Sequence, residues 1–453
     1  MSTVAAISTP PGSGGISVIR ISGEDAIPVA DRCFRSLSGK KLADTAGYSA
    51  LYGKICDGET VIDEAVALVF RAPKSYTGED VVEISCHGGG YAAQSVLRAI
   101  LSCGADAAGP GEFTKRAFLN GKTDLAAAEA VMQVISARGK ESLRAAVNTL
   151  EGALSKKIAE IKASLITLSA ALSVWTDYPD DDMFDVDPAA VDSALEYAKI
   201  ELNDLLSRFD SGQAVSVGVD TVICGKPNVG KSAFMNLLAG REKSIVTAVA
   251  GTTRDIIEEN VLFGNVLLHL ADTAGIHGTG DTVEMIGVDR AIEKMRRAAL
   301  VFAVFDSSVP LDGEDMEIIH FCKDKRCIAV LNKSDKETVV TVSALSPYFD
   351  RVAVLSAKTG DGKKALEAMT EQLLGTANID TSAPMLMNER QYRCCAAALQ
   401  YITEALDANR AGMTLDAVNV GIDAAINELS VLTGEKATET VVNEIFERFC
   451  VGK

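Results

Sequence analysis

The chain is short of aromatic residues and histidine, and its cysteines lack the spacing of a metal-binding or redox motif. Aromatic residues make up 5% of its 453 residues, with a single Trp, and there are four His. The histidines, at positions 87, 269, 277 and 320, show no metal-ligand spacing, and none of the ten cysteines forms a C-x-x-C pair. This pattern argues against a protein-ligated zinc ion and against a dithiol redox motif. It predicts reduced thiols that lie mostly in cores.

Long apolar runs and an excess of basic residues are also missing. No run reaches the roughly 18 apolar residues of a membrane helix, and the start, Met1-Ser2-Thr3-Val4, lacks the basic and apolar regions of a secretion signal. With 44 Lys and Arg against 62 Asp and Glu, the formal net charge is −18. Broad nonspecific binding of nucleic acid depends on basic residues that neutralise phosphates, so it is not expected here. We expect a cytoplasmic protein without a membrane partner.

A chain of this length needs about two or three cores, and its texture changes along the sequence. Apolar and β-branched runs at 16–21 and 64–70 predict strands in a mixed N-terminal part, where glycines at 12–15 and 88–90 predict turns or close backbone approach. Residues at helical spacing follow, and then apolar strands that alternate with helices, which indicates a mostly parallel sheet. The predicted fold is α/β multidomain. Its parts are an N-terminal α/β domain at 1–118, an all-α helical domain at 119–215 and 377–453, and an inserted P-loop α/β domain at 216–376.

The most informative stretch is the octet Gly225-Lys226-Pro227-Asn228-Val229-Gly230-Lys231-Ser232. It follows an apolar strand run at 219–224 and precedes a helical pattern that begins at Ala233. In this order of strand, G-x-x-x-x-G-K-[ST] loop and helix, backbone amides surround a polyphosphate. Lys231 is expected to reach the outer phosphates, and Ser232 is expected to hold Mg²⁺.

Four further motifs follow in the order found in GTP-binding proteins. They are G-T-T-R-D at 251–255, D-T-A-G at 272–275, N-K-S-D at 332–335 and S-A-K at 356–358. Asp335 can accept two hydrogen bonds from the N–H edge of guanine, which adenine does not offer, so GTP is favoured over ATP. The residues predicted to bind GTP are Asn228, Val229, Gly230, Lys231, Ser232, Ala233, Thr247, Thr252, Thr253, Asp272, Thr273, Ala274, Gly275, Asn332, Lys333, Asp335, Ser356, Ala357 and Lys358.

The residues expected to drive hydrolysis are less usual. Many GTPases place a Gln after D-x-x-G to orient the attacking water, but Ile276 stands there. Either hydrolysis is slow or another polar group replaces the Gln. The amide oxygen of Asn228, with carbonyls at 247–252, could form a monovalent-cation cage, or Asn228 only shapes the loop. Glu284 is the nearest downstream carboxylate that could orient water, or it is an ordinary exposed helical residue.

Motifs outside the nucleotide-binding segment carry a resemblance. They are Thr9-Pro10-Pro11-Gly12 with Gly14-Gly15, Tyr76-Thr77-Gly78-Glu79-Asp80, His87-Gly88-Gly89, Pro110-Gly111-Glu112-Phe113, Arg116-Ala117-Phe118-Leu119-Asn120-Gly121-Lys122 and the terminal Cys450-Val451-Gly452-Lys453. With these, the chain resembles the MnmE (TrmE) family of tRNA-modification GTPases over essentially its whole length.

The resemblance implies a function. Members of this family join an N-terminal tetrahydrofolate-binding domain to a helical domain that carries an inserted GTPase domain. They form a homodimer through the N-terminal domains. They act with an FAD-dependent partner, MnmG (GidA), in a heterotetramer or larger complex. Together the two proteins add an aminomethyl or carboxymethylaminomethyl group to carbon 5 of the wobble uridine of certain tRNAs. Potassium drives the GTPase domains together and accelerates hydrolysis.

The resemblance also implies roles for single residues. Asn228, Thr247, Val249 and Thr252 match the K⁺ site, the middle two mainly through backbone oxygens. Ser232 and Thr253 match the Mg²⁺ ligands, and Glu284 matches the glutamate that orients water. The positions that contact 5-formyl-tetrahydrofolate or a related tetrahydrofolate are Arg20, Glu83, Lys122 and Lys453.

Two residues leave alternatives open. Cys450 is either a nucleophile or acid in the modification chemistry or a small thiol packed beside the folate pocket. His277 stands where many relatives have Arg. As an alternative to the modification enzyme, a regulatory or ribosome-assembly GTPase would act as a switch. Such proteins typically append a basic RNA-binding module, and neither terminal region here is basic.

Overall fold

The computed structural model describes residues 2–177, 187–240, 258–271 and 298–453. Contacts within the chain separate it into two units. One comprises Met1–Met132, Ser155–Ala194 and Gln400–Lys453, and the other comprises Gln133–Leu154 and Leu195–Leu399. The two units are described in turn.

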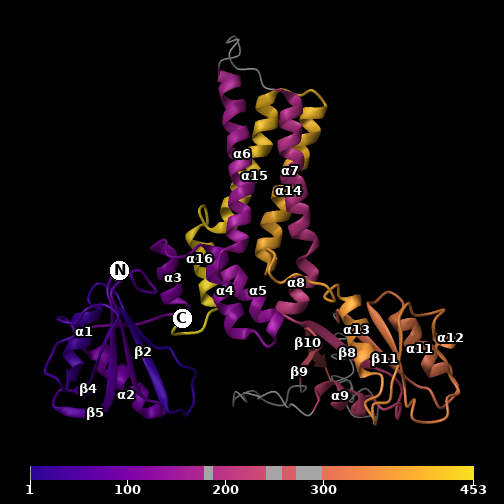
Figure 1. Cartoon of the computed structure of the whole chain (residues 1–453), viewed down its shortest axis with the longest axis horizontal. Coiled ribbons are helices and arrows are strands. Elements are labelled where there is room, and N and C mark those ends of the chain that lie inside the picture. The colour runs from indigo at the N-terminus through magenta and orange to yellow at the C-terminus, as the bar shows by residue number, and fades with distance from the viewer. Residues whose placement is uncertain (1, 178–186, 241–257, 272–297) are drawn as a thin grey trace, which may run out of the picture. The chain divides into compact units, whose positions relative to one another are not determined.

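The first unit contains a sheet of seven strands in the order β3-β4-β5-β6-β2-β1-β7 (Figure 1). All neighbours are antiparallel except β1 and β7. The strands are β1 (Val4–Ile7), β2 (Ile16–Ser22), β3 (Phe34–Ser36), β4 (Ser49–Asp57), β5 (Thr60–Phe70), β6 (Val81–His87) and β7 (Asp106–Ala107). Helices α1 (Ala26–Cys33) and α2 (Gly90–Ser102) pack on one face.

Alternation along the strands sets the two faces of this sheet. Ile19 and Ile21 of β2 and Ile84 of β6 are fully buried in the core under α1 and α2. Because successive side chains of a strand point to opposite faces, Arg20 and Glu83 lie on the face away from those helices.

The predicted strands at 16–21 and 64–70 are confirmed, and so is the close approach of the two glycine-rich stretches. The Gly14 amide donates to the Gly88 carbonyl at 3.0 Å, and the Gly88 amide donates to the Gly15 carbonyl at 3.3 Å. A Cβ at position 88 would lie 2.5 Å from the carbonyl oxygen of Gly14. A side chain there would push the two loops apart.

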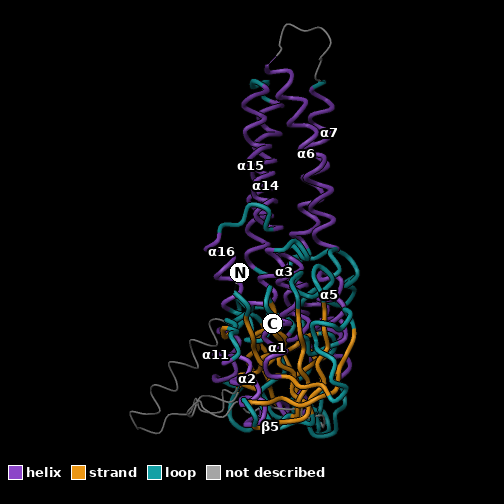
Figure 2. Tube along the Cα trace, turned by 90° about the vertical axis from the view of Figure 1, so that its left-hand side faces the viewer, coloured by secondary structure: helices purple, strands orange, loops and turns teal. Residues whose placement is uncertain are grey.

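The rest of the first unit is helical. It includes α3 (Glu112–Leu119), α6 (Ala153–Asp177), α15 (Leu415–Thr433), α16 (Glu439–Glu447) and most of α4 (Leu125–Ser136). Helices α6 and α15 are two of the long helices in Figure 2, and their contacts show that they run antiparallel. Lys162 pairs with Glu435 at 2.6 Å, and Ser169 donates to Asp423 at 2.8 Å.

The stretch Ala153–Thr176 of helix α6 is long and apolar enough, by length and composition alone, to cross a membrane. Core helices of bundles pass the same test. Ile158, Ile161 and Leu165 of α6 are fully buried, at the spacing of one helix face. Burial accounts for these three residues, while 28% of the apolar window as a whole is buried.

The second unit contains a six-stranded sheet in the order β13-β12-β11-β8-β10-β9. All neighbours are parallel except β9 and β10, which confirms the predicted mostly parallel sheet. The strands are β8 (Val219–Cys224), β9 (Glu258–Phe263), β10 (Val266–Ala271), β11 (Leu300–Asp306), β12 (Cys327–Asn332) and β13 (Val352–Val354).

Helices cover both faces of this sheet (Figure 1). Leu300, Phe302 and Val304 of β11 belong to one core with α9 (Lys231–Ala239) and α13 (Lys363–Leu373). The alternate residues of the same strand belong to a second core with α11 (Gly313–Cys322) and α12 (Val342–Leu345). This unit also includes α5 (Lys140–Leu150) and α8 (Phe209–Ser216). Helices α7 (Pro188–Ser207) and α14 (Glu389–Arg410) contribute residues to both units.

Candidate functional site

The phosphate loop runs from the end of β8 to the first turn of α9. The backbone is left-handed at Asn228 (φ 66°) and at Gly230 (φ 97°). The Lys231 ammonium donates to the carbonyls of Gly225 at 2.8 Å and Lys226 at 3.0 Å. Ser232 is exposed in the first turn of α9. A loop with this course presents its amides and the positive end of a helix to a phosphate.

Asn332 joins three of the predicted motifs. Its side-chain amide donates to the Val229 carbonyl of the phosphate loop at 2.8 Å, and its amide oxygen accepts from the Ala357 backbone at 2.9 Å. The side chain is 2% exposed. A Cβ at Gly230 would lie 2.5 Å from the Asn332 side-chain nitrogen, so the loop needs glycine there. One buried amide thus fixes the phosphate loop against N-K-S-D and S-A-K.

Lys333 adds a second link. Its ammonium donates to the Asn228 carbonyl at 2.7 Å and pairs with Asp306 at 2.5 Å. Burial raises the pKa of the Asp306 carboxyl, but hydrogen bonds from Lys333 and Ser308 outweigh this effect and hold the pKa below its ordinary value. The ionised Asp306 therefore keeps Lys333 over the phosphate loop.

Asp335, in the N-K-S-D motif, has a carboxylate held by one hydrogen bond. It is exposed, and it accepts a hydrogen bond from the Ser356 hydroxyl at 2.7 Å, which lowers the pKa of its carboxyl. Ser356 itself is fully buried and so fixes the carboxylate. An ionised, oriented carboxylate can accept the two N–H groups of guanine.

One ion cluster at this site was not predicted from the sequence. Lys226, inside the octet, pairs with Asp312 at 2.6 Å and with Asp315 at 2.7 Å. Hydrogen bonds to Asp312 and then Asp315 raise the pKa of Lys226. The two carboxylates also form the capping box of α11, and the D-G-E-D run at 312–315 carries that signal in the sequence.

A second cluster lies in the N-terminal sheet. Arg20 and Glu83 are direct cross-strand partners on β2 and β6, with the guanidinium 2.8 Å from the carboxylate. The guanidinium also lies over two rings, 5.1 Å from the centroid of Tyr76 and 5.4 Å from that of Phe113. We call Arg20, Glu83, Tyr76 and Phe113 the aromatic slot. It combines a paired charge with the partly exposed ring of Tyr76, backed by the buried ring of Phe113, and a partly exposed ring beside a charge pair suits a flat, polar, heterocyclic ligand.

The C-terminal segment binds beside α3. The Gly111 amide donates to the Cys450 carbonyl at 3.3 Å, and the Phe113 amide donates to the main-chain oxygen of Lys453 at 3.1 Å. The structure therefore brings Lys453 to the helix that carries Phe113. Lys122 donates to the Pro73 carbonyl at 3.1 Å.

Comparison with known proteins identifies the family. The family model of the TrmE N-terminus matches residues 3–122, and that of the MnmE helical domain matches residues 125–450. Proteins named tRNA modification GTPase MnmE are 39% identical in Clostridioides difficile and 40% identical in Latilactobacillus sakei. These alignments cover 100% of this chain and 99% and 98% of the relatives. The chain belongs to the MnmE (TrmE) family.

Membership confirms the resemblance and the predicted fold class, with an N-terminal α/β domain, a helical domain and a P-loop α/β domain. Among solved structures, the G domain of the T. maritima FeoB iron transporter covers 35% of this chain at 24% identity and a TM-score of 0.27, too low to support a statement on fold. The domain boundaries drawn from the sequence stay predictions, because the units defined by contacts divide the helical part differently.

Several residues to which the motifs and the family resemblance assign roles lie outside the described residues. They are Thr247, Val249, Thr252, Thr253, Asp272, Thr273, Ala274, Gly275, Ile276, His277 and Glu284. Their predicted roles stay predictions. Of the proposed K⁺ and Mg²⁺ ligands, only Asn228 and Ser232 are described, and both are exposed at the phosphate loop.

The cysteines largely match the prediction of reduced thiols that lie mostly in cores. All ten cysteines are free, and seven are buried. Cys450 is exposed, which does not fit the alternative of a packed thiol. Its role as a nucleophile or acid stays a prediction.

Proposed function

We propose that this protein is a GTP hydrolase that acts in tRNA modification. The observation that carries this proposal is the double hydrogen bond of Asn332, which joins the phosphate loop to the base-reading motifs. Bound GTP supplies the phosphoryl group that is transferred to water. Lys231 and the loop amides hold its phosphates, and Asp335 selects guanine.

The finer part of the proposal is a potassium-activated reaction. Asn228 and carbonyls at 247–252 match the positions that hold K⁺ in the family, and Glu284 orients the attacking water. Two GTPase domains come face to face in the homodimer. With the FAD-dependent MnmG (GidA) partner, the product is a tRNA whose wobble uridine carries an aminomethyl or carboxymethylaminomethyl group at carbon 5. This part rests on family membership.

Turnover measurements test the GTPase. We expect hydrolysis to be faster in K⁺ than in Na⁺ at equal ionic strength, with and without the partner. Glu284→Ala should lower the turnover rate about 100-fold or more, the range of a lost acid–base or water-orienting group, and should leave nucleotide affinity nearly unchanged. Turnover that is indifferent to the cation, or that survives this substitution, would contradict the mechanism.

The tRNA itself separates modification from a ribosome-assembly switch. Nucleosides from a deletion strain should lack the modified wobble uridine, and expression of the wild-type chain should restore it. Unmodified tRNA in the deletion strain, restored by wild type but not by Glu284→Ala, links hydrolysis to the chemistry. Unchanged wobble uridines in the deletion strain would favour the switch.

We also propose that the aromatic slot binds a tetrahydrofolate. Glu83 can accept hydrogen bonds from the N–H edge of the pterin, Tyr76 offers a half-exposed ring face, and Lys122 and Lys453 supply charges for the glutamate tail. Calorimetry with 5-formyl-tetrahydrofolate tests this. Glu83→Gln keeps the shape of the side chain and should weaken binding. Equal affinity of Glu83→Gln and wild type would remove Glu83 from the site.

A further inference from the structure

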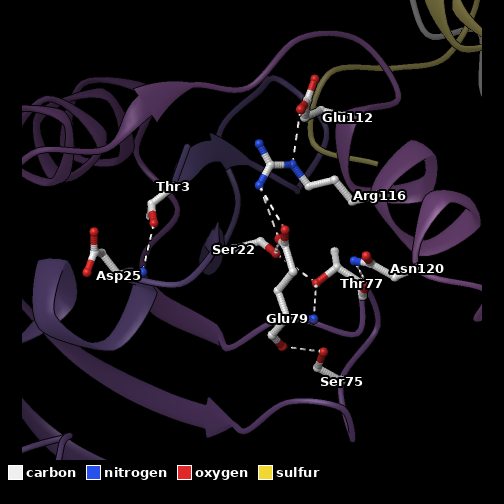
Figure 3. Close-up of polar contacts among 9 residues, drawn as sticks. All are labelled: Thr3, Ser22, Asp25, Ser75, Thr77, Glu79, Glu112, Arg116 and Asn120. Carbon is white, nitrogen blue, oxygen red and sulfur yellow. Dashed lines mark hydrogen bonds and ion pairs between the residues drawn. The ribbon is translucent and has the colours of Figure 1, made fainter. Parts of the chain in front are cut away.

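An ion cluster around a buried arginine lies in the same part of the chain as the aromatic slot, and none of the functions proposed above uses it (Figure 3). Arg116 of α3 is 3% exposed. One of its terminal nitrogens donates to both carboxylate oxygens of Glu79, at 3.2 and 3.1 Å, and its Nε donates to Glu112 at 3.0 Å. We call Arg116, Glu79 and Glu112 the buried clamp.

The buried clamp joins three separate parts of the chain. Glu79 lies in the loop after β5, Arg116 lies on α3, and the Ser22 hydroxyl at the end of β2 donates to Glu79 at 2.7 Å. Ser22 also shares a hydrogen bond with Thr77 at 2.7 Å, and Asn120 donates to the Thr77 carbonyl at 2.8 Å. Figure 3 shows these groups converging from the strand, the loop and the helix. The loop and α3 are therefore fixed to the sheet at one place.

Both clamped segments carry a ring of the aromatic slot. The loop carries Tyr76, and the first turn of α3 carries Phe113, three residues before Arg116. The hydroxyls of Tyr76 and Thr114 form a hydrogen bond at 2.9 Å, which links the two segments again. The same turn of α3 donates its Phe113 amide to Lys453. The clamp therefore holds the two segments that carry the rings, and one of these segments also binds the C-terminal residues.

Arg116 is buried, whereas the side chains of Glu79 and Glu112 are 16% and 28% exposed, and stability alone does not explain the burial of this guanidinium. Taking a guanidinium and carboxylates out of water is costly, and well-packed apolar residues often replace buried ion pairs without loss of stability. A planar guanidinium that donates from two of its nitrogens to two different carboxylates does fix the relative geometry of the groups that hold it. Such a cluster is useful where two segments have to be held in one arrangement.

We propose that Arg116 is a positioning residue of the aromatic slot. Held by Glu79 and Glu112, it sets the spacing of Tyr76 and Phe113 around Arg20 and fixes the turn that seats Lys453. It does not itself touch the ligand. The inference rests on the proposed binding of a tetrahydrofolate by this slot.

The test compares three variants of the full-length protein. Arg116→Lys keeps the charge, but one ammonium lacks the planar fork that serves both carboxylates. The double variant Arg116→Met with Glu79→Gln removes both charges of the central pair and keeps a side-chain amide that can accept from Ser22. Arg35→Lys is the matched control, because Arg35 lies in the same sheet and donates to the Gly58 carbonyl away from the slot.

Binding of 5-formyl-tetrahydrofolate is measured by calorimetry and stopped-flow fluorescence, and folding by thermal melting. We expect the double variant to melt within a few degrees of wild type. Its dissociation constant should rise about tenfold, as for a slot that is correctly arranged in about one molecule in ten. Association should slow while dissociation changes little, because no direct contact is lost. Arg116→Lys should also associate more slowly with little change in dissociation, and Arg35→Lys should bind as wild type.

Hydrogen exchange supplies a readout that needs no ligand. The Phe113 amide should exchange faster in the double variant, because the turn that donates to Lys453 is no longer held. Wild-type affinity and exchange in a folded double variant would overturn the role of Arg116. Failure of the wild-type protein to bind any tetrahydrofolate would instead remove the folate proposal, and this inference with it.

Discussion

At the residue scale, Asn332 of the N-K-S-D motif makes hydrogen bonds to two other motifs. It is buried and bonds to both the phosphate loop and the S-A-K segment. Asn332→Ala should therefore leave the Val229 carbonyl and the Ala357 amide without their partner, at a cost of about 1–3 kcal/mol. Affinity for a fluorescent GDP analogue should fall at least tenfold. Asn236→Ala, an exposed position on α9 of the same unit, is the control and should bind normally. Equal affinities would contradict the role given to Asn332.

His87 provides a prediction on pH. Its imidazole is exposed, its Nδ1 lies 2.6 Å from Asp63, and its backbone amide donates to the other oxygen of the same carboxylate at 2.8 Å. The hydrogen bond to Asp63, then the charges of Asp63 and Glu64, raise the pKa of His87. The pair therefore contributes stability that is full below about pH 6.5, the ordinary histidine value, and is lost as pH rises through the raised pKa of the folded state.

An NMR titration of the His87 ring measures this effect. Wild type should titrate above the ordinary histidine value, and Asp63→Asn should bring the midpoint back down. His87→Gln assigns the signal among the four histidines. A midpoint that does not move in Asp63→Asn would show that Asp63 does not hold the imidazolium.

At the element scale, the parallel sheet could be predicted from the sequence and much of the antiparallel one could not. Strands β11 and β12 are apolar up to their last residue because helices bury both of their faces. Strand β4 instead has Gly53 in its interior, where a Cβ would lie 2.7 Å from the ring of Phe34. Close packing explains this glycine, but in the sequence it is typical of a loop.

The candidate sites divide in the same way. The phosphate loop is contiguous and follows a fixed spacing, so its residues are found from the sequence alone. In the buried clamp, Glu112 and Arg116 are one helical turn apart, but only the fold brings Glu79 to Arg116 and Ser22 to Glu79. Arg20 and Glu83 are 63 positions apart, and without the family resemblance they are indistinguishable from ordinary strand charges.

The C-terminal segment supplies a prediction for one element. Gly452 has φ 97°, and a Cβ there would collide with the Ile7 carbonyl and lie 2.9 Å from Cα of Ser8. Gly452→Ala should release the segment and increase the rate at which a thiol reagent labels Cys450. Gly412→Ala is the control, because φ is 70° but nothing lies within 4 Å of its Cβ. Both changes carry roughly 1–2 kcal/mol of left-handed strain. Equal labelling rates in the two variants would show that the collision does not matter.

At the scale of the whole molecule, the nucleotide site and the aromatic slot belong to different units. Helices α7 and α14 contribute residues to both. A reaction that couples GTP hydrolysis to chemistry at the slot needs a conformational change that both units take part in. Potassium-dependent pairing of GTPase domains is the step proposed to start it. Because the net charge of −18 repels phosphates, the proposed action on tRNA needs a local surface or the proposed partner to bind the tRNA.

Asn228 tests the proposed potassium step. Its backbone is left-handed, and Lys333 donates to its carbonyl. Ala at this position removes the side-chain amide and adds roughly 1–2 kcal/mol of left-handed strain, so GDP affinity is measured beside the potassium effects. Asn228→Ala should abolish the preference for K⁺ over Na⁺ in GTP turnover. It should also abolish potassium-dependent self-association of the GTPase domains, measured by energy transfer between labelled copies of the full-length chain. Affinity for GDP should stay within a few-fold of wild type, because Lys231 and the loop amides remain, and Asn236→Ala should keep both potassium effects. A potassium preference that persists in Asn228→Ala would leave this residue with only the role of shaping the loop.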